Sequence, residues 1–310
     1  MAEPAPPPPP SLRLRTRRAI KRVTFLCVRA LVRAGGFWRA GALGRALGEL
    51  QYRFSGAAAA RYRRDMAQAL GRSDDDPRTA IELREAWRVN TGAVLEILSM
   101  FDRKVDPARM AAHCRIDGIE HLEAASRAGR GVLLLGAHMG NGAMIPVCLA
   151  ASGWPVSVVY KQSRMMSAGF FQHGLAEYGI EPIMANEGMK AYARMLGALR
   201  KGRVVFIMAD QGTKTQNDGI VLRFLGKDMP MPAGPAQLAR HSHAPVLPFE
   251  TLAARPQWHF QIHPPLERPP GSTLEDDAAQ MLRTLEAMVV RHPSLWSWPH
   301  RRWRLYRPAA

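Results

Sequence analysis

The sequence predicts an α/β protein with a mixed, largely parallel sheet flanked by helices and preceded by an N-terminal basic amphipathic helical arm. The apolar run at 131–136 is bounded by glycines, which is typical of a parallel strand covered on both faces. After this run, short apolar stretches alternate with segments of helical length and periodicity. Before residue 60, arginines are spread among leucine, valine, phenylalanine and tryptophan side chains.

The N-terminal part is predicted to contain two segments. Residues 1–11 are rich in proline, and we expect them to be disordered. Residues 12–60 are predicted to form a basic amphipathic helical segment that associates with an anionic membrane surface. The apolar run at 23–32 contains Arg29 and is shorter than the roughly 20 residues of a membrane span, and no signal-peptide cleavage pattern follows it. The alternatives for residues 12–60 are a helical arm that packs on the remaining domain and an integral membrane anchor.

Residues 61–310 are predicted to form the α/β domain, which begins with helices. Three aspartates and Pro77 precede the apolar positions of a long helix, as expected for a helix N-terminus. Glu96 lies on that helix, and we interpret it as solvated or at the edge of the core. Helices are also predicted at 165–178, 188–200, 234–241 and 274–291. Strands are predicted at 156–160, 180–184, 203–209, 220–224, 246–250 and 258–263.

Charge and cysteine content limit the classes of partner and cofactor. The net charge of +17 and an isoelectric point near 10.8 indicate an anionic partner. No nucleic-acid-binding motif is present, so we expect no nucleic-acid partner and favour an anionic membrane surface. The three cysteines are scattered, and the His113–Cys114 and His241–His243 groups have no second cluster at metal-ligand spacing. We therefore expect no metal, no cofactor and no disulfide framework.

Polar residues follow two of the predicted strands. His138 comes directly after the strand at 131–136, at the sheet edge where open α/β sheets bind ligands, and imidazole titrates near neutrality. It is a candidate general base or, alternatively, a buried structural histidine. Gly140, Asn141 and Gly142 then form either a simple turn or a set of backbone N–H donors for a developing oxyanion. Asp210 and Gln211 end the strand at 203–209.

Several motifs resemble one family in order and spacing. They are His138-Met-Gly-Asn-Gly-Ala143, Val158-Val-Tyr-Lys161, Ala209-Asp-Gln-Gly212, Arg223-Phe-Leu-Gly226 and Trp296-Ser-Trp-Pro-His-Arg-Arg-Trp303. The chain thereby resembles the bacterial lysophospholipid acyltransferase-like superfamily, in particular its lipid A (lauroyl and myristoyl) acyltransferase branch. The family signature is a histidine followed, after four residues, by glutamate or aspartate.

This chain departs from that signature at one position, because the acidic residue is replaced by Ala143. In the family the acid orients the histidine and stabilises the imidazolium. Three interpretations follow: a distant acid substitutes, with Asp210 as first candidate; the histidine works slowly alone; or catalysis has been lost. Asp210 could alternatively bind an acceptor group.

The resemblance implies a membrane-associated enzyme on the cytoplasmic face of a bacterial inner membrane, attached peripherally or by its N-terminus. It would transfer a fatty acyl group from a thioester, most simply on acyl carrier protein, to a lipid or glycolipid acceptor. His138 and Asp210 would be the catalytic residues. The residues expected to bind substrate are Gly140, Asn141, Gly142, Lys161, Arg164, Gln211 and Arg223. Lys161, Arg164, Arg223 and Lys227 would contact phosphate on the acceptor or on the carrier's phosphopantetheine arm.

The C-terminal aromatic residues leave two interpretations open. Trp296, Trp298, Trp303 and Tyr306 stand among basic residues, which suits either a membrane interface or packing against the sheet. Two rival functions also remain. Ala143 favours a catalytically degenerate homologue that binds lipid or carrier protein, and the positive charge alone would also suit a nucleic-acid binder.

Overall fold

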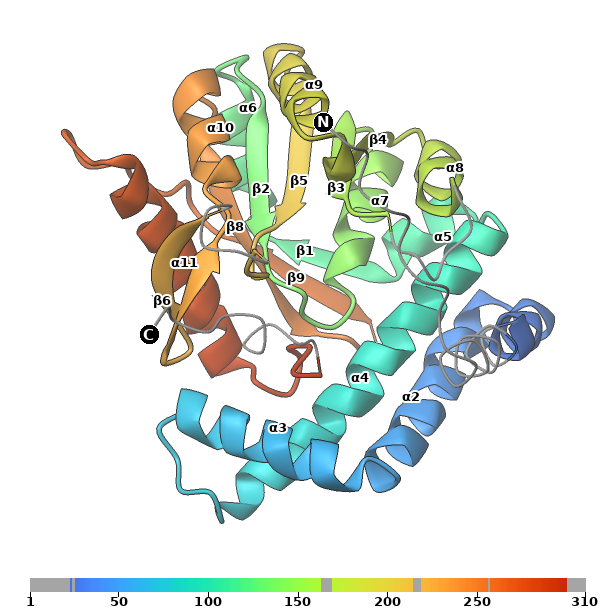
Figure 1. The fold of residues 1–310 in the computed structure, drawn as a ribbon. Coiled ribbons are helices and arrows are strands. Elements are labelled where there is room, and N and C mark those ends of the chain that lie inside the picture. The colour runs from blue at the N-terminus through green and yellow to red at the C-terminus, as the bar shows by residue number, and fades with distance from the viewer. Residues whose placement is uncertain (1–22, 24–25, 163–168, 214–218, 256, 300–310) are drawn as a thin grey trace, which may run out of the picture.

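A seven-stranded sheet forms the centre of the computed structural model, which describes residues 23, 26–162, 169–213, 219–255 and 257–299 (Figure 1). The strand order is β1-β9-β8-β2-β5-β3-β4. All neighbours are parallel except β8 and β9, which are antiparallel. The bounds are β1 Cys114–Asp117, β2 Val132–Gly136, β3 Val156–Tyr160, β4 Glu181–Met184, β5 Val204–Met208, β8 Val246–Ala253 and β9 Trp258–Ile262. The expected mixed, largely parallel sheet is therefore confirmed.

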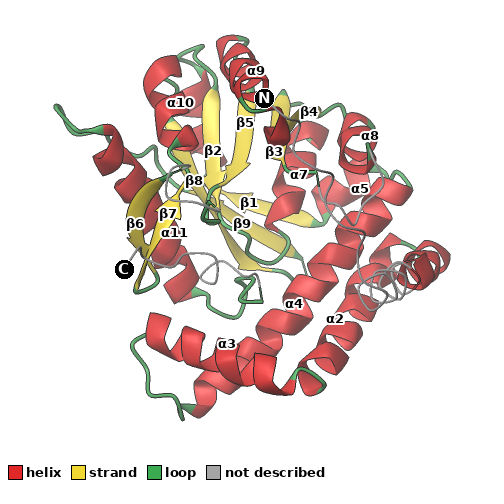
Figure 2. Cartoon of the chain, viewed as in Figure 1, coloured by secondary structure: helices red, strands yellow, loops and turns green. Residues whose placement is uncertain are grey.

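Helices cover both faces of this sheet (Figure 2). Leu133 and Leu135 of β2 point into one apolar cluster, and Val132 and Leu134 point into the other, because side chains alternate along a strand. The first cluster includes α9 Met189–Arg200, α10 Gly234–Ser242 and α11 Leu274–Arg291. The second includes α5 Pro107–Ala112, α6 Ile119–Ser126, α7 Ile145–Ala151 and α8 Phe170–Ala176. Two single-turn helices, η1 Gly142–Met144 and η2 Ala185–Glu187, complete this part of the chain.

Several elements differ from the predicted set. The strand at 220–224 exists as β6 Ile220–Phe224, but it pairs only with β7 Lys227–Met231 in a separate two-stranded hairpin. Strands β1 and β7 were not expected. They are short and contain charged residues or proline, so the alternating apolar pattern that signals a strand is weak there. The helix predicted at 165–178 corresponds to α8, and residues 165–168 lie outside the described residues.

The predicted long helix is α4 Pro77–Asp102, and its start has the expected cap. Asp76 accepts a hydrogen bond from the backbone N–H of Arg78 at 2.9 Å, with Pro77 in the first turn. Helix α2 Phe37–Arg53 runs alongside α4, and α3 Gly56–Ala69 follows it (Figure 1). A Cβ atom at Gly44 or Gly48 would lie 2.5–2.6 Å from the α4 backbone, so these glycines permit the close approach of the two helices.

The N-terminal predictions are only partly covered by the described residues. Residues 1–22, including the proline-rich start, lie outside them, and the domain boundary at residue 60 remains a prediction. Residues 26–35 are helical. Within the described part of the chain, no helix combines the length and the apolar character that a membrane crossing requires.

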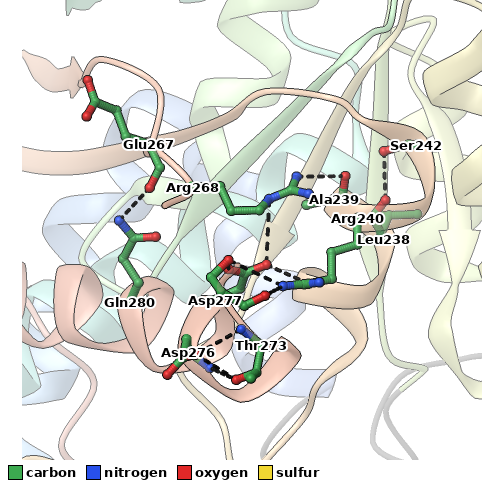
Figure 3. Close-up of polar contacts among 11 residues, drawn as sticks. Leu238, Ala239, Arg240, Ser242, Glu267, Arg268, Thr273, Asp276, Asp277 and Gln280 are labelled. Carbon is green, nitrogen blue, oxygen red and sulfur yellow. Dashed lines mark hydrogen bonds and ion pairs between the residues drawn. The ribbon is translucent and has the colours of Figure 1, made fainter. Parts of the chain in front are cut away.

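Figure 3 shows the polar contacts between α10, the start of α11 and the segment before it. Arg240 precedes β8, which is parallel to β2, so this group lies at the amino edge of the sheet, whereas His138 follows β2 at the carboxyl edge. Thr273 and Asp276 form a reciprocal capping box at the start of α11, as the sequence pattern favours. Asp277 lies between Arg240 of α10, at 2.7 Å, and Arg268, at 3.6 Å. A cavity of about 140 Å³ lies beside this ion-pair group and the start of β8.

Candidate active site

His138 and Asp210 meet because of the register of two adjacent parallel strands. Gly136, the last residue of β2, lies opposite Met208, the last residue of β5. His138 and Asp210 each follow two residues later, and neighbouring strands are about 4.8 Å apart. The two side chains therefore emerge side by side at the carboxyl edge of the sheet. His138 Nδ1 lies 2.6 Å from Asp210 Oδ1.

The hydrogen bonds of Asp210 indicate which ring nitrogen of His138 carries a proton. Its carboxylate is fully buried, whereas the His138 side chain is 33% exposed. Asp210 Oδ2 accepts hydrogen bonds from the His138 backbone N–H at 3.1 Å and from the Trp296 indole N–H at 2.7 Å. An ionised carboxylate only accepts hydrogen bonds, so the imidazole carries its proton on Nδ1 when it is neutral. The Nε2 lone pair is then available as a base.

The Gln211 side chain contacts the same imidazole ring. Its side-chain nitrogen is 3.1 Å from His138 Nε2 and 3.5 Å from His138 Nδ1, so the amide lies beside both ring nitrogens. The structure thus brings together His138, Asp210 and Gln211, as the sequence predicted.

The turn after His138 is held in place by backbone bonds and leaves one N–H available. Gly140, with a φ of +46°, donates its N–H to the Leu295 carbonyl at 2.8 Å, and Gly142 donates to Met139 at 3.0 Å. These two N–H groups are therefore already bonded. Among the described residues, the Asn141 N–H has no backbone acceptor and Asn141 is 2% exposed, and the role of this N–H as an oxyanion donor stays a prediction.

The Asn141 side chain contacts a buried acid. Its amide donates to Glu96 of α4, and Arg255 Nη2 lies 3.9 Å from the same carboxyl group. Glu96 is 8% exposed, so of the two sequence-based interpretations, solvated or at the edge of the core, the solvated one is wrong. Burial is the main cause that raises the pKa of Glu96 to about 7, against the lowering effect of Arg255 and Asn141. A cavity of about 10 Å³ lies between these groups.

The basic residues expected to contact phosphate are spread over the molecule. Lys161 is exposed directly after β3, at the same sheet edge as His138. Arg223 lies on the β6–β7 hairpin with its side chain 72% exposed, 4.0 Å from Asp228. Lys227 forms an ion pair with Asp65 at 2.7 Å. Arg164 lies outside the described residues.

The C-terminal aromatic residues include one contact that the sequence analysis missed. Trp296 and Trp298 are each 1% exposed, so packing is the correct interpretation for these two, and the bond from Trp296 to Asp210 was not foreseen. The tryptophan in the family-like terminal motif was the only feature of the sequence that pointed to a role for Trp296. Trp303 and Tyr306 lie outside the described residues. Among the described residues, no group of three or more histidine, cysteine or acidic side chains could hold a metal ion.

Comparison with known proteins gives a consistent result. The family model for bacterial lipid A biosynthesis acyltransferases matches residues 12–305. A phosphatidylinositol mannoside acyltransferase of Mycobacterium tuberculosis is 29% identical over 193 residues, which cover 61% of this chain and 59% of that protein. The match thus spans about three fifths of that relative's length. The lipid A biosynthesis lauroyltransferase of Escherichia coli K12 is 24% identical over 270 residues, 84% of each chain.

A solved structure is also similar. The 1-acyl-sn-glycerophosphate acyltransferase of Thermotoga maritima is 11% identical, with a TM-score of 0.36, and the match covers 78% of this chain and 94% of that one.

Proposed function

The chain belongs to the bacterial lipid A biosynthesis acyltransferase family, and on that premise we propose that it transfers a fatty acyl group from an acyl thioester to a lipid or glycolipid acceptor. The observation that carries the proposal is the 2.6 Å contact between His138 Nδ1 and Asp210 Oδ1. It supplies the carboxylate partner that Ala143 cannot provide. It therefore favours the interpretation in which a distant acid substitutes for the missing one.

The proposed reaction uses the imidazole first as a base and then as an acid. His138 Nε2 takes the proton of an acceptor hydroxyl while the hydroxyl oxygen attacks the thioester carbonyl carbon. The ionised Asp210 stabilises the imidazolium, and the Asn141 N–H faces the oxyanion. The C–O bond of the new ester forms, the C–S bond breaks, and the leaving thiolate takes the proton from the imidazolium. The acceptor hydroxyl approaches Nε2 beside the Gln211 amide.

The proposed donor is acyl carrier protein, an acidic partner suited to a chain with a net charge of +17. Lys161, at the same sheet edge as His138, is the described basic residue best placed to meet a phosphate on the donor or the acceptor. A donor comparison checks this part: at equal concentration and low salt, acyl carrier protein thioesters should be used faster than the matching coenzyme A thioesters, and the preference should weaken as salt is added. Equal rates with both donors at all salt concentrations would argue against a carrier protein.

We place the protein at the cytoplasmic face of the bacterial inner membrane. The corner between α2 and α3 supports membrane contact, because Phe54 is 84% exposed and Leu50 51% exposed, next to Arg53 with a 67% exposed side chain. Apolar tips beside basic groups suit the interface of an anionic leaflet. Phe54→Ser should weaken sedimentation with anionic vesicles, whereas Val221→Ser, at a 40% exposed valine on β6, should not. A preference for duplex DNA over vesicles would contradict the placement.

The decisive test of function is lipid analysis in cells. Cells with the intact protein should contain a membrane lipid that is heavier by one acyl chain than the corresponding lipid in cells that produce His138→Ala at equal abundance. Mass spectrometry of total lipid extracts measures this difference. Identical lipid profiles in the two strains would favour the rival function suggested by Ala143, a degenerate homologue that binds lipid or carrier protein.

A further inference from the structure

The segment 295–298, which follows α11, closes over the turn that carries His138. Gly140 donates its N–H to the Leu295 carbonyl at 2.8 Å, and Ser297 donates its N–H to the His138 carbonyl at 3.1 Å. Met139 and Trp296 form an antiparallel bridge between these contacts. The segment is therefore bonded to the backbone on both sides of the turn.

Helices at the other side hold the same segment in place. The Asn90 amide on α4 donates to the Leu295 carbonyl at 3.1 Å and to the Trp296 carbonyl at 3.2 Å. The Tyr62 hydroxyl on α3 donates to the Pro299 carbonyl at 3.0 Å. Buried backbone groups that are bonded in this way fix the path of the chain, so the position of the Trp296 Cα atom is fixed as well.

The Trp296 side chain uses this position to reach Asp210. Its indole N–H is 2.7 Å from Asp210 Oδ2, and both side chains are 0–1% exposed. The other carboxylate oxygen, Oδ1, faces His138 Nδ1. Rotation about the terminal bond of an aspartate side chain is intrinsically soft. Oδ2 accepts from this indole and, at 3.1 Å, from the His138 backbone N–H, so the two donors together set the direction of the other oxygen.

We propose that Trp296 is a positioning residue for the His138–Asp210 pair, because its indole N–H, the shorter of the two bonds to Oδ2, acts with the His138 backbone N–H to turn Oδ1 of the carboxylate towards the imidazole. The catalytic meaning of this role rests on the proposed function. The orientation itself can be measured without any substrate.

The chain provides a matched control in Trp298. This side chain is also 1% exposed, and its indole donates to the Pro293 carbonyl at the same distance of 2.7 Å. The two indole rings pack edge to face with centroids 4.7 Å apart. Trp298→Phe thus removes an equivalent buried N–H bond from the same segment without removing a donor from Asp210.

Kinetics separate a positioning role from a purely structural one. Trp296→Phe should lower kcat about tenfold or more, the factor expected for losing a hydrogen bond to a charged group, with KM changed less than twofold. Trp298→Phe should keep kcat within about twofold while losing a similar amount of thermal stability. Equal kcat values for the two variants at equal folded fraction would overturn the proposal.

Nitrogen NMR of selectively labelled histidine provides a readout that needs no activity. At a pH where the ring is neutral, the His138 signals should show a proton on Nδ1 in the wild type and in Trp298→Phe, and a mixture of tautomers in Trp296→Phe. Signals that are the same in both variants would refute the positioning role, even in a protein found to be inactive. An inactive wild type with the expected NMR difference would instead refute the proposed function alone.

A second substitution at Trp296 tests the proposal even if Trp296→Phe fails to fold. Replacing the Trp296 indole by benzothiophene keeps the ring shape and substitutes sulfur for the N–H, so the surrounding core stays filled. This protein should show the same tautomer mixture as Trp296→Phe. Wild-type signals in the benzothiophene protein would overturn the proposal.

Discussion

Two buried aspartates at opposite edges of the sheet differ in the side chains that bond to their carboxylates. Asp277, at the amino edge, accepts from Arg240 at 2.7 Å and Ser272 at 2.7 Å, with Arg268 at 3.6 Å (Figure 3). Asp210, at the carboxyl edge, accepts from the His138 ring and the Trp296 indole. A guanidinium keeps its proton at any working pH, whereas an imidazole exchanges its proton near neutrality.

The difference separates a structural site from a chemical one. The ion pair between Arg240 and Asp277 joins α10 to α11, and its guanidinium does not give up a proton, so we expect it to contribute to stability alone. In the proposed reaction His138 takes up and releases a proton beside Asp210, and the His138 side chain is one-third exposed. Glu250 also pairs with an arginine: burial acts to raise the pKa of Glu250, but His263 at 3.1 Å and Arg291 at 2.9 Å keep it below the usual range.

The largest effect is expected at the chemical aspartate. Asp210→Asn preserves shape but offers His138 Nδ1 an amide that can donate, which favours the wrong tautomer. In a serine-protease triad the same change lowers kcat about 10⁴-fold, and we expect a loss of similar order in acyl transfer, with the fold intact. Steady-state kinetics and a thermal melt together check this. A loss below tenfold would remove the distinction between the two aspartates.

Glu96 offers a pH test of a buried acid near the turn. Because its pKa is raised from 4.5 to about 7 by burial, the folded protein holds a proton there that the unfolded chain has already released. The contribution of Glu96 to stability is thus complete below pH 4.5 and is lost as the pH rises towards 7. Glu96→Gln should lack this loss, so its stability relative to wild type should rise by on the order of 2–3 kcal/mol across that window.

Urea unfolding at a series of pH values measures this difference for both proteins. Two stability curves that run parallel from acid to neutral pH would show that Glu96 is ionised normally in the folded state. Activity of Glu96→Gln should remain, since its contact is with the Asn141 side chain and not with the Asn141 backbone N–H.

Substitution of Asp277 should lower stability and leave kcat unchanged, the opposite of the result expected at Asp210. Asp277→Asn leaves Arg240, whose side chain is 29% exposed, without its anionic partner. Because solvent still reaches Arg240, we expect a loss of about 2 kcal/mol of stability, below the value for a fully buried pair. The kcat per folded molecule should not change. Unaltered stability combined with a lower kcat would reverse the roles assigned to the two edges.

The smallest effect is expected at Ala143. Restoring the family acid with Ala143→Glu should leave kcat within about threefold, because Asp210 already occupies Nδ1 of His138. A rise of more than tenfold would show that Asp210 is a poor substitute and that the site lacks its proper acid.

The sequence predicted the His138–Asp210 pair because the pair depends only on where two parallel strands end. Trp296 was beyond such reasoning, since it lies 86 residues from Asp210 in sequence and its bond depends on how a C-terminal loop folds back. The burial of Glu96 was predictable only in part for a related reason. Helical periodicity sets it at the edge of the core, and Gly41 of α2 has no side chain there, so α2 comes close enough to bury it.

Strand pairing was also only partly predictable. The apolar alternation at 220–224 correctly predicts a strand, yet nothing local tells whether it joins the main sheet or a hairpin. The tight turn at Leu225 and Gly226, both with positive φ, decides in favour of the hairpin with β7.

The most direct measurement compares two histidines that each pair with an aspartate. His259 Nε2, on β9, lies 2.7 Å from Asp117 of β1, and β8 separates β9 from β2, the strand that precedes His138. Purified wild type, His138→Ala and His259→Ala would be incubated with an acyl carrier protein thioester and bacterial membrane lipids, and acylated lipid would be quantified. We expect His138→Ala to fall to background while His259→Ala keeps most of the rate. Equal rates for the two variants, or a wild type at background, would contradict the assignment of acyl transfer to His138.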